Sequence, residues 1–352
     1  MKIVFVVPDM AGGGTERVIS LLANEYVRRG IDTAILSFAG SQQAYPLDER
    51  VETVSAGAPS GGSLKVRFAR LLFMRRYFKT NRNCCIFSFS TIGTGFIVLS
   101  TIFMKRRMLV SERTDPRSCD HKPYRDFFYG FCDALVCQTK DAVSCFPKKL
   151  QKRARVIANP VDAALPERFI GERRKSIATA GRLEPVKNHR MLIEAFSIFA
   201  KDHPDYTLDI YGQGSLEEEL KRYTVELGIQ KKVVFHGFCR NVKEIIRDSS
   251  MFILSSNYEG VSNSMIEALA MGVPVIATDC PIGGSRTYIH DGENGLLVPV
   301  GNADRMAEAM SKLSENSKLS EKFSKKSVNI RKECSVEKIA DQMLEASGIE
   351  WK

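Results

Sequence analysis

The stretch Asn257–Asp279 reads NYEGVSNSMIEALAMGVPVIATD and combines a loop, a helix and a strand. Gly260 allows the backbone to form a tight turn. Ser262 or Asn263 can accept hydrogen bonds from the free amides at the start of a helix. The segment MIEALAMG then predicts about two helical turns, and VPVIAT predicts a buried strand. This order of loop, helix and strand is typical of a parallel α/β sheet.

Two glutamates flank the predicted start of this helix. Glu259 and Glu267 are separated by a cap and two turns, which corresponds to roughly 10 Å at a rise of 1.5 Å per residue. That is about the span from the ribose of a nucleotide to the sugar on its diphosphate, and the helix amides between them favour an anion. Taken alone, the pair is better explained by an exposed Glu259 and a solvated or salt-bridged Glu267 on an ordinary helix.

The same segment resembles the retaining glycosyltransferases of family 4, whose mark is a glutamate, seven residues and a second glutamate within an EG(x)S/P…EAxAxGxPV context. The matching residues are Glu259, Gly260, Ser262, Glu267, Ala268, Ala270, Gly272, Pro274 and Val275. The resemblance extends over nearly the whole chain. It implies an α/β architecture of the GT-B fold, in which two Rossmann-like doubly wound domains face a central cleft. It also implies a catalytic role for Glu259 and contacts from Val261, Ser262, Asn263 and Glu267 to a nucleotide-sugar donor.

A second motif, AGRLEPVKN at Ala180–Asn188, lies between a predicted strand and a predicted helix. Arg182 offers a planar guanidinium and Lys187 a compact point charge, and together they can neutralise a departing diphosphate. Surface Arg and Lys side chains are ordinarily solvated, so these residue types alone do not assign a role. The GRL(x)xxKN pattern is similar to another hallmark of family 4, which implies that both cations are catalytic.

Three glycine-containing loops also follow predicted strands. Gly12-Gly13-Gly14 lies before the first helix, where glycines let a ligand approach the backbone and the helix amides. A tight turn would be the default reading, but by resemblance Gly13 and Gly14 face the donor phosphates and the acceptor. The loop His236–Phe238 ends another strand, and the resemblance implies that Phe238 lies near the nucleotide base. The segment Ile210–Gly214 resembles the family's G(x)G turn, which concerns the fold more than the chemistry.

The chain departs from the family pattern at two loops. Arg113 follows a strand of the first half, where many relatives have a histidine near the acceptor. It could help to bind an anionic acceptor, and a structural ion pair is an equal alternative. Thr287 stands where relatives often carry a glutamate, so the role of that loop in selecting the donor sugar stays open.

The chain has 352 residues, which is enough for two domains that each bury a core. Strands and helices alternate twice, before and after a polar segment that follows Asn159-Pro160. We therefore expect an N-terminal acceptor-binding domain over residues 1–160 and a C-terminal donor-binding domain over residues 161–334. By resemblance, a final helix at about residues 335–352 should pack back on the first domain.

The net charge of +10 is unevenly distributed. Residues 1–160 carry 25 Lys and Arg against 13 Asp and Glu, whereas residues 161–352 carry 26 against 28. The segment Lys65–Arg82, KVRFARLLFMRRYFKTNR, interleaves basic and apolar residues, which suits an anionic membrane surface. A solvated helix face is the simpler alternative. No RNA- or DNA-binding module can be recognised, so nucleic acid is not an expected partner.

Other features of the sequence limit where the protein can be located and which chemistry it can use. Nine cysteines without regular spacing favour reduced thiols, the N-terminus does not resemble a signal peptide, and the longest apolar run, Ile92–Met104, is too short to span a bilayer. A cytoplasmic protein, peripheral on the inner face of the membrane, is therefore expected. The sequence contains no Asp-x-Asp pair, so we expect neither a catalytic metal nor a cofactor, the nucleotide sugar being a substrate.

The resemblance implies a retaining hexosyl- or N-acetylhexosaminyltransferase. Its donor would be a nucleotide diphosphate sugar with UDP as the expected nucleotide, and its acceptor a lipid-linked glycan in capsule, exopolysaccharide or similar glycan assembly. Two other functions fit the same architecture, because a fold does not fix a function. One is a nucleotide-sugar epimerase, and the other is a non-catalytic protein that binds sugar nucleotides.

Overall fold

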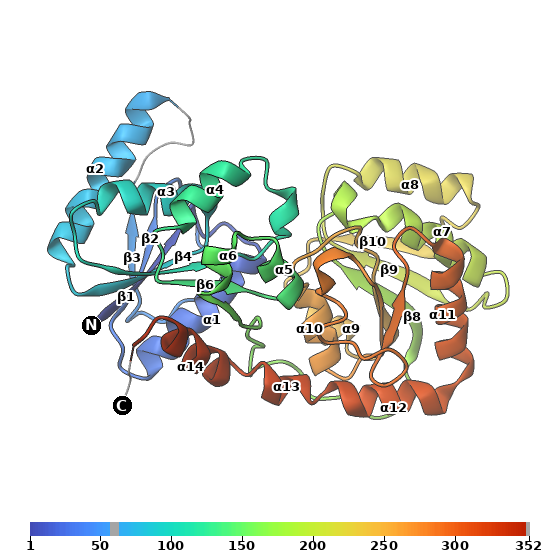
Figure 1. Cartoon of the computed structure of the whole chain (residues 1–352). Coiled ribbons are helices and arrows are strands. Elements are labelled where there is room, and N and C mark those ends of the chain that lie inside the picture. Colours follow the sequence, from blue (N-terminus) through green and yellow to red (C-terminus); the bar gives the residue numbers. More distant parts are fainter. Residues whose placement is uncertain (57–62, 350–352) are drawn as a thin grey trace. The chain divides into compact units, whose positions relative to one another are not determined.

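The computed structural model describes residues 1–56 and 63–349. The chain forms two compact units (Figure 1). The first unit contains Met1–Pro160 and the C-terminal residues from Cys334, and the second contains Val161–Glu333. Of the expected C-terminal helix, residues 350–352 lie outside the described part of the chain.

The first unit is built on a seven-stranded parallel sheet with the strand order β3-β2-β1-β4-β5-β6-β7. Its strands are β1 (Lys2–Val7), β2 (Thr33–Ser37), β3 (Glu52–Ser55), β4 (Cys84–Ser88), β5 (Arg107–Ser111), β6 (Ala134–Cys137) and β7 (Ala154–Val156). The strands β1, β2, β4 and β6 are almost fully buried, as apolar strands covered on both faces by helices should be.

Helices cover both faces of this sheet. They are α1 (Gly14–Arg28), α2 (Leu64–Thr80), α3 (Thr91–Ser100), α4 (Lys122–Tyr129), α5 (Lys140–Ser144), α6 (Lys148–Gln151) and α14 (Val336–Ala346), with a 3₁₀ turn at Pro116–Ser118. Helices α1 and α14 lie together on one face, whereas α2, α3 and α4 lie on the other (Figure 1). Within the described residues, no helix is long and apolar enough to cross a membrane.

The last helix, α14, completes the core of the first unit. Its residues Ile339 and Met343 are fully buried in the same cluster as Phe5 and Tyr26. The Tyr26 hydroxyl donates to the carbonyl of Ala340 at 3.2 Å. Each apolar side chain buried in this way contributes about 1.5–3 kcal/mol, so α14 belongs to the core and is not an appendage.

The second unit contains a six-stranded parallel sheet with the order β10-β9-β8-β11-β12-β13. Its strands are β8 (Arg174–Ala180), β9 (Thr207–Tyr211), β10 (Val233–Gly237), β11 (Ser249–Leu254), β12 (Val275–Thr278) and β13 (Leu296–Val298). Its helices are α7 (His189–Phe199), α8 (Glu217–Glu226), α9 (Val242–Ile246), α10 (Asn263–Ala270), α11 (Ala303–Glu315), α12 (Ser317–Ser327) and α13 (Ile330–Glu333), with 3₁₀ turns η2 (Pro185–Lys187) and η3 (Pro281–Gly283).

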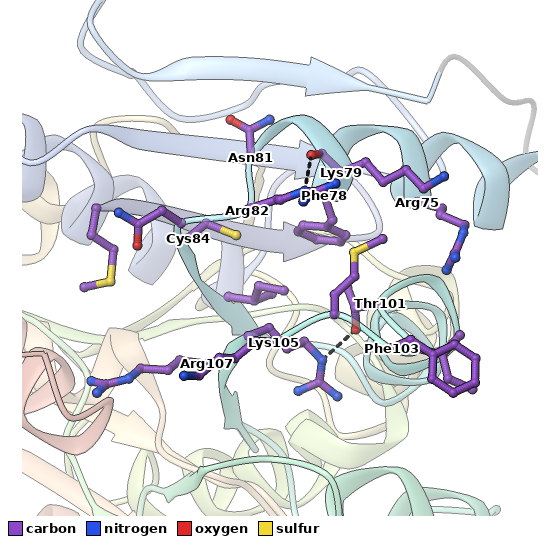
Figure 2. Close-up of a pocket in the computed structure, with 16 residues that line it drawn as sticks. Arg75, Phe78, Lys79, Asn81, Arg82, Cys84, Thr101, Phe103, Lys105 and Arg107 are labelled. Carbon is purple, nitrogen blue, oxygen red and sulfur yellow. Dashed lines mark hydrogen bonds between the residues drawn. The ribbon is translucent and has the colours of Figure 1, made fainter.

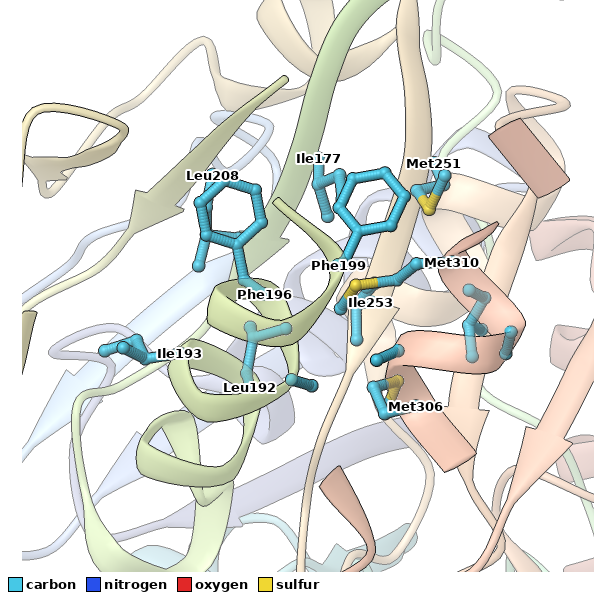
Figure 3. Close-up of a cluster of buried hydrophobic side chains, with 14 of the residues drawn as sticks. Ile177, Leu192, Ile193, Phe196, Phe199, Leu208, Met251, Ile253, Met306 and Met310 are labelled. Carbon is cyan, nitrogen blue, oxygen red and sulfur yellow. The ribbon is translucent and has the colours of Figure 1, made fainter. Parts of the chain in front are cut away.

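The core of the second unit joins one sheet face to α7 and α11. Phe196 and Phe199 of α7 pack beside Met310 of α11 over the strand residues Ile177 and Met251 (Figure 3). The apolar residues of α7 recur at helical spacing, which turns one side of the helix toward the sheet. This packing fixes the start of α7, and with it the loop that precedes the helix.

The prediction of two doubly wound α/β halves is confirmed. In both sheets the first strand lies between the second strand and the fourth, so the chain changes direction across the sheet at β1–β4 and at β8–β11. Three strands were not recognised in the sequence: β3, β7 and β13. These are short, at three or four residues, and each lies at an edge of its sheet.

Candidate active site

The candidate site of the second unit lies at the carboxyl ends of β8 and β11. These strands are neighbours in the sheet, but one leads to β9 on one side and the other to β12 on the opposite side. Loops that leave a parallel sheet in opposite directions open a crevice, and doubly wound proteins bind their ligands there. The two sequence motifs, Ala180–Asn188 and Asn257–Asp279, follow these two strands.

The loop after β8 holds Lys187 in place. The turn η2 (Pro185–Lys187) ends at Asn188, whose backbone is left-handed with φ 47°. Asn tolerates this conformation better than most residues, and its side-chain oxygen accepts from the amide of Met191 at 3.3 Å to cap α7. Arg182 lies earlier in the same loop and is exposed. Its guanidinium makes no hydrogen bond or ion pair with the described residues.

Hydrogen bonds tie this loop to the loop after β11. The Asn188 side-chain amide donates to the Asn257 side-chain oxygen at 2.8 Å. The backbone amide of Asn257 donates to the carbonyl of Val186 at 2.9 Å. The Ser255 hydroxyl donates to the carbonyl of Lys187 at 2.8 Å. The two loops therefore form one cross-linked surface, which fixes the side chains that it carries.

Lys187 and Glu259 form an ion pair on this surface. The Ser256 hydroxyl also donates to the Glu259 carboxylate at 3.3 Å. The two charged side chains are 15% and 22% exposed, so they are partly shielded and can still meet a ligand. The thiol of Cys280 lies near this pair, and burial together with the Glu259 charge raises its pKa to about 11. A neutral thiol of this kind is a poor nucleophile.

The next helix, α10, begins beside this ion pair. Ser262 is its N-cap and accepts from the amide of Met265 at 3.5 Å, which selects Ser262 over Asn263 as the capping residue. The Ser264 hydroxyl donates to the carbonyl of Ala180 at 2.9 Å, so α10 also contacts the end of β8. Val261 and Ser262 are buried. Asn263 and Glu267 are half-buried, with Glu267 one turn further along the helix.

Glycines allow backbone segments to approach one another closely at three points of this site. A Cβ on Gly212 would lie 1.9 Å from the carbonyl oxygen of Gly181, and a Cβ on Gly214 would lie 2.3 Å from that of Leu183. Gly284 likewise lies against Gly260, where a Cβ would come within 1.7 Å of the carbonyl oxygen. The G(x)G turn therefore packs directly beneath the Arg182 loop.

The loop that contains Thr287, one of the two places where the chain departs from the family pattern, is held by interactions within the loop. The Thr287 hydroxyl donates to the carbonyl of Gly283 at 2.8 Å. Arg286 pairs with Asp279 at 2.6 Å, and Ile282 adopts a left-handed backbone with φ 61°. Thr287 thus stabilises the turn η3, which lies against Gly260.

The loop after β10 presents an aromatic side chain. Phe238 is 72% exposed. Just before it, His236 stacks on Tyr211 with 4.4 Å between ring centroids, and its Nε2 lies 2.7 Å from a carboxylate oxygen of Asp209. These contacts fix the end of β10, and Phe238 itself extends beyond the strand into solvent.

Three predicted site residues belong to the first unit. Gly13 is the N-cap of α1 and Gly14 is its first residue, at the carboxyl end of β1. Arg113 follows β5, where its Nε donates to the Ser111 hydroxyl at 2.7 Å and its guanidinium also donates to the Asn159 side chain. Its guanidinium carbon lies 5.2 Å from the centre of the Phe89 ring. Arg113 is therefore anchored by neutral groups at this end of the sheet.

Sequence reasoning missed several residues that shape the site. Ser256, Asn257 and Ser264 were inside or beside the quoted motif, yet no role was assigned to them. Their position directly after a buried strand was the available signal. His189 was also missed. It is buried at the start of α7, and burial together with the nearby Lys187 charge lowers its pKa to about 4, so this imidazole is neutral.

The residues that the structure describes contain no group of three or more His, Cys, Asp or Glu side chains that could hold a metal ion. The charged groups gathered at the β8–β11 crevice are Arg182, Lys187 and Glu259, with Glu267 on α10. Two cations and a helix N-terminus favour a phosphate group at this place.

Residues 162–329 match the family model described as "Glycosyl transferases group 1", so the match covers the second unit. The chain is 26% identical over 344 residues to an uncharacterized glycosyltransferase of Haemophilus influenzae, covering 96% of this chain and 97% of that protein. The comparisons support a GT-B glycosyltransferase. The chain is also 27% identical, over 97% of its length and 98% of the other, to a Campylobacter jejuni N-acetylgalactosaminyltransferase named for a diphospho-undecaprenol glycan.

Solved GT-B structures share the fold across the whole chain. Anabaena HepE in complex with UDP and glucose has a TM-score of 0.85 at 17% identity, covering 99% of both chains. Staphylococcus aureus TarM has a TM-score of 0.82 at 15% identity, covering 98% of both. At this level of identity the likeness concerns the fold alone.

Proposed function

We propose that this chain is a retaining glycosyltransferase of family 4 that transfers a hexose or N-acetylhexosamine from a UDP-sugar to a lipid-linked glycan. In this proposal the second unit binds the donor and the first unit binds the acceptor. The reaction serves the assembly of a capsule, an exopolysaccharide or a similar glycan.

The ion pair between Lys187 and Glu259 at the β8–β11 crevice is the observation that carries the proposal. An isolated carboxylate there would repel a diphosphate, whereas a carboxylate paired with Lys187 and bonded to Ser256 does not leave a net negative charge. Arg182 is exposed beside it and is not engaged by other described side chains. Its guanidinium is therefore available for a phosphate group.

Each group then has a chemical role. The bond between the anomeric carbon and the β-phosphate oxygen breaks, and a bond from the acceptor oxygen to the same carbon forms on the same face. The acceptor proton passes to the departing phosphate oxygen. Arg182 and Lys187 stabilise the charge that develops on the diphosphate, and preorganised cations are most effective at that moment. Glu259 orients the transferred sugar through its hydroxyl groups, and Glu267 accepts from the ribose hydroxyls.

The names of similar proteins guide the choice of substrates. A Campylobacter jejuni relative is named as an N-acetylgalactosaminyltransferase acting on an undecaprenol-linked glycan, and HepE was solved with UDP and glucose. A lipid-linked acceptor suits a protein that works peripherally at the cytoplasmic face of a membrane, and the basic first unit agrees with that location. No metal is part of the proposed mechanism.

A panel of nucleotide sugars, tested with and without a membrane lipid extract, examines this proposal. We expect one UDP-sugar to be consumed only when the extract is present, with UDP and a lengthened lipid-linked glycan as products. Conversion of the UDP-sugar without an acceptor would identify an epimerase instead. Binding of the UDP-sugar without turnover in any extract would identify a sugar-nucleotide-binding protein.

A further inference from the structure

A pocket lies in the first unit, at the amino ends of β4 and β5. It has a volume of about 610 Å³ and lies between the C-terminal part of α2 and the segment that joins α3 to β5 (Figure 2). The candidate site residues of this unit, Gly13, Gly14 and Arg113, follow the carboxyl ends of their strands instead. The pocket therefore lies at the amino ends of the strands, opposite the ends that carry the candidate site residues, and it is a separate site.

The pocket is strongly basic. Its lining contains six cations and, among the described residues that form it, no carboxylate: Arg75, Lys79, Arg82, Lys105, Arg106 and Arg107. The whole sequence from Thr53 to Ser111 contains no Asp or Glu, although ten Lys and Arg lie within it. Opposing charges are thus absent both from the wall and from the segments that build it.

The cations are partly fixed and partly available. The Arg75 guanidinium donates to the carbonyl of Ser100 at 3.2 Å, and the Arg106 Nε donates to the Thr101 hydroxyl at 2.6 Å. Burial lowers the pKa of Arg106, whose guanidinium nevertheless stays charged at neutral pH. Lys79 and Lys105 are exposed on opposite walls (Figure 2). Like charges held around one cavity favour a bound anion.

The rim of the pocket is apolar. Ile102 and Phe103 are 50% and 97% exposed at the tip of a turn that is closed by the Met104 amide, which donates to the carbonyl of Thr101 at 2.8 Å. Phe103 has a left-handed backbone with φ 65°, an uncommon and unfavourable conformation for an aromatic residue. Because the Phe103 ring lies in solvent, no packing in the core of this protein offsets the strain of this backbone conformation.

The surface around the pocket continues this character. Ten of the eighteen large hydrophobic side chains exposed in the described residues lie on α2, α3, α4 and their connections. They are Leu64, Phe68, Leu72, Ile92, Leu99, Ile102, Phe103, Tyr124, Phe127 and Phe131. Helix α2 buries three of its residues, namely Arg70, Met74 and Phe78. Arg70 therefore does not belong to the exposed basic surface that the sequence of α2 suggested.

We propose that this pocket binds the phosphate-bearing headgroup of an anionic membrane lipid, while Phe103 and Ile102 enter the acyl region beside it. A free phosphate would need the cations but not the apolar rim, whereas a lipid presents an anion and hydrocarbon together. This inference deepens the proposed function, because it assigns the contact by which the enzyme would stay at the membrane. The site itself takes no part in sugar transfer.

Partitioning to vesicles tests the pocket against a diffuse basic patch. The pocket variant combines Lys79→Ala, Arg82→Ala and Lys105→Ala, and the matched variant combines Lys65→Ala, Arg67→Ala and Arg76→Ala, all at exposed positions. Each cation near an anionic surface changes partitioning by about fivefold, so three cations can change it by about a hundredfold. We expect the pocket variant to lose about a hundredfold on phosphatidylglycerol vesicles at low salt, and the matched variant to lose clearly less.

A fluorescent reporter tests the apolar rim. The sequence has one tryptophan, Trp351, so Phe103→Trp in a Trp351→Phe background gives a single emitter. Its emission should shift to the blue on phosphatidylglycerol vesicles and not on phosphatidylcholine vesicles. Inorganic phosphate at millimolar concentration should neither shift the emission nor release the protein from vesicles.

Three results would overturn the inference. These are equal losses in the pocket and matched variants, no binding of the wild type to anionic vesicles, or displacement by inorganic phosphate, which would identify a site for a free anion. Transfer from UDP-sugar to a detergent-solubilised lipid extract separates this inference from the proposed function. The pocket variant should keep that activity, and vesicle binding without any transfer activity would refute the proposed function alone.

Discussion

Lys187 and Glu259 are paired across the change of strand direction at β8–β11, although 72 residues separate them in the sequence. Each follows one of the two strands at that point, and hydrogen bonds from the Ser255 hydroxyl and the Asn257 backbone amide hold the Lys187 loop. The charge of the site is therefore fixed before a substrate arrives. Most electrostatic catalysis depends on such preorganisation.

Replacing the cations of the site should affect turnover more than folding. Arg182→Ala and Lys187→Ala should each reduce kcat about a hundredfold or more, since a preorganised group at a developing charge contributes roughly 3–4 kcal/mol. Arg182→Ala should leave the Tm almost unchanged because the side chain is exposed and makes no hydrogen bond or ion pair with the described residues. Lys201→Ala, at another exposed position of the second unit, is the control. Wild-type kcat in both site variants would remove them from the mechanism.

Glu267→Gln should weaken the binding of the donor. A carboxylate that accepts from two ribose hydroxyls makes charge-assisted hydrogen bonds of about 1.5–3 kcal/mol, so the Kd for UDP should rise about tenfold to a hundredfold. Isothermal titration calorimetry measures this, with the exposed Glu226→Gln of α8 as control. An unchanged Kd would contradict the assignment of Glu267 to the ribose.

Chelation should not abolish activity. The sequence has no Asp-x-Asp pair, and the described residues hold no cluster of three metal-ligating side chains. In the proposed mechanism Arg182 and Lys187 supply the positive charge that a metal would provide. The rate of UDP release should therefore be the same within a factor of about two with excess EDTA. A complete loss that magnesium or manganese restores would show that a metal is required.

Gly212→Ala should destabilise the second unit strongly. The new methyl group would lie 1.9 Å from the backbone oxygen of Gly181, in a residue with φ 139°. Gly228 also has a positive φ, at 69°, but a Cβ added there has no atom within 4 Å. Gly228→Ala therefore measures the cost of the backbone conformation without a clash. We expect a loss of about 1 kcal/mol for Gly228→Ala and several kcal/mol for Gly212→Ala, measured by urea denaturation. Equal losses would show that the backbone contact relaxes.

Acid should destabilise the protein through His189. Its pKa is about 4 in the folded state against about 6.5 in the unfolded chain, because burial disfavours the charged ring. The unfolded state thus binds the proton first, and the contribution to stability that is complete above pH 6.5 is lost as the pH falls toward 4. At pH 5 the loss is about 2 kcal/mol relative to pH 7.

The free energy of unfolding at pH 7 and pH 5 measures this loss. His189→Phe should remove about 2 kcal/mol of the difference between the two pH values, whatever its effect at pH 7. The exposed His290→Gln should leave the difference as in the wild type. A pH dependence that His189→Phe does not change would mean that the imidazole is not buried in its neutral form.

The fold could be predicted from the sequence because its central strands are long apolar runs that end in glycine or polar loops. KIVFVV and SIATA are examples, and both became buried strands. The edge strands β3, β7 and β13 could not be recognised, because three or four residues are too few to show a hydrophobic period. Their pairing depends on the sheet that is already present.

The residues of the candidate site that belong to a motif could be predicted from the sequence. The contacts that depend on packing between distant segments could not. The motifs selected Lys187 and Glu259, but nothing in the sequence indicated that these two form a pair. The burial of His189 and the backbone contact between Gly284 and Gly260 likewise depend on packing between distant segments. The roles of the site residues in binding and catalysis stay predictions for the experiments above.

Helix α14 supplies Ile339, Ala340, Met343 and Leu344 to a core that, apart from these residues and Ile349, comes from the first part of the chain. During synthesis the ribosome makes all of the second unit before it reaches this helix, a delay of about ten seconds or more at 5–20 residues per second. The apolar groove that α14 fills, which includes Tyr26, is therefore open to water or to a chaperone throughout that interval. The second unit, continuous in sequence, should reach its native state on the ribosome before the first, which reverses the usual order of folding from the N-terminus.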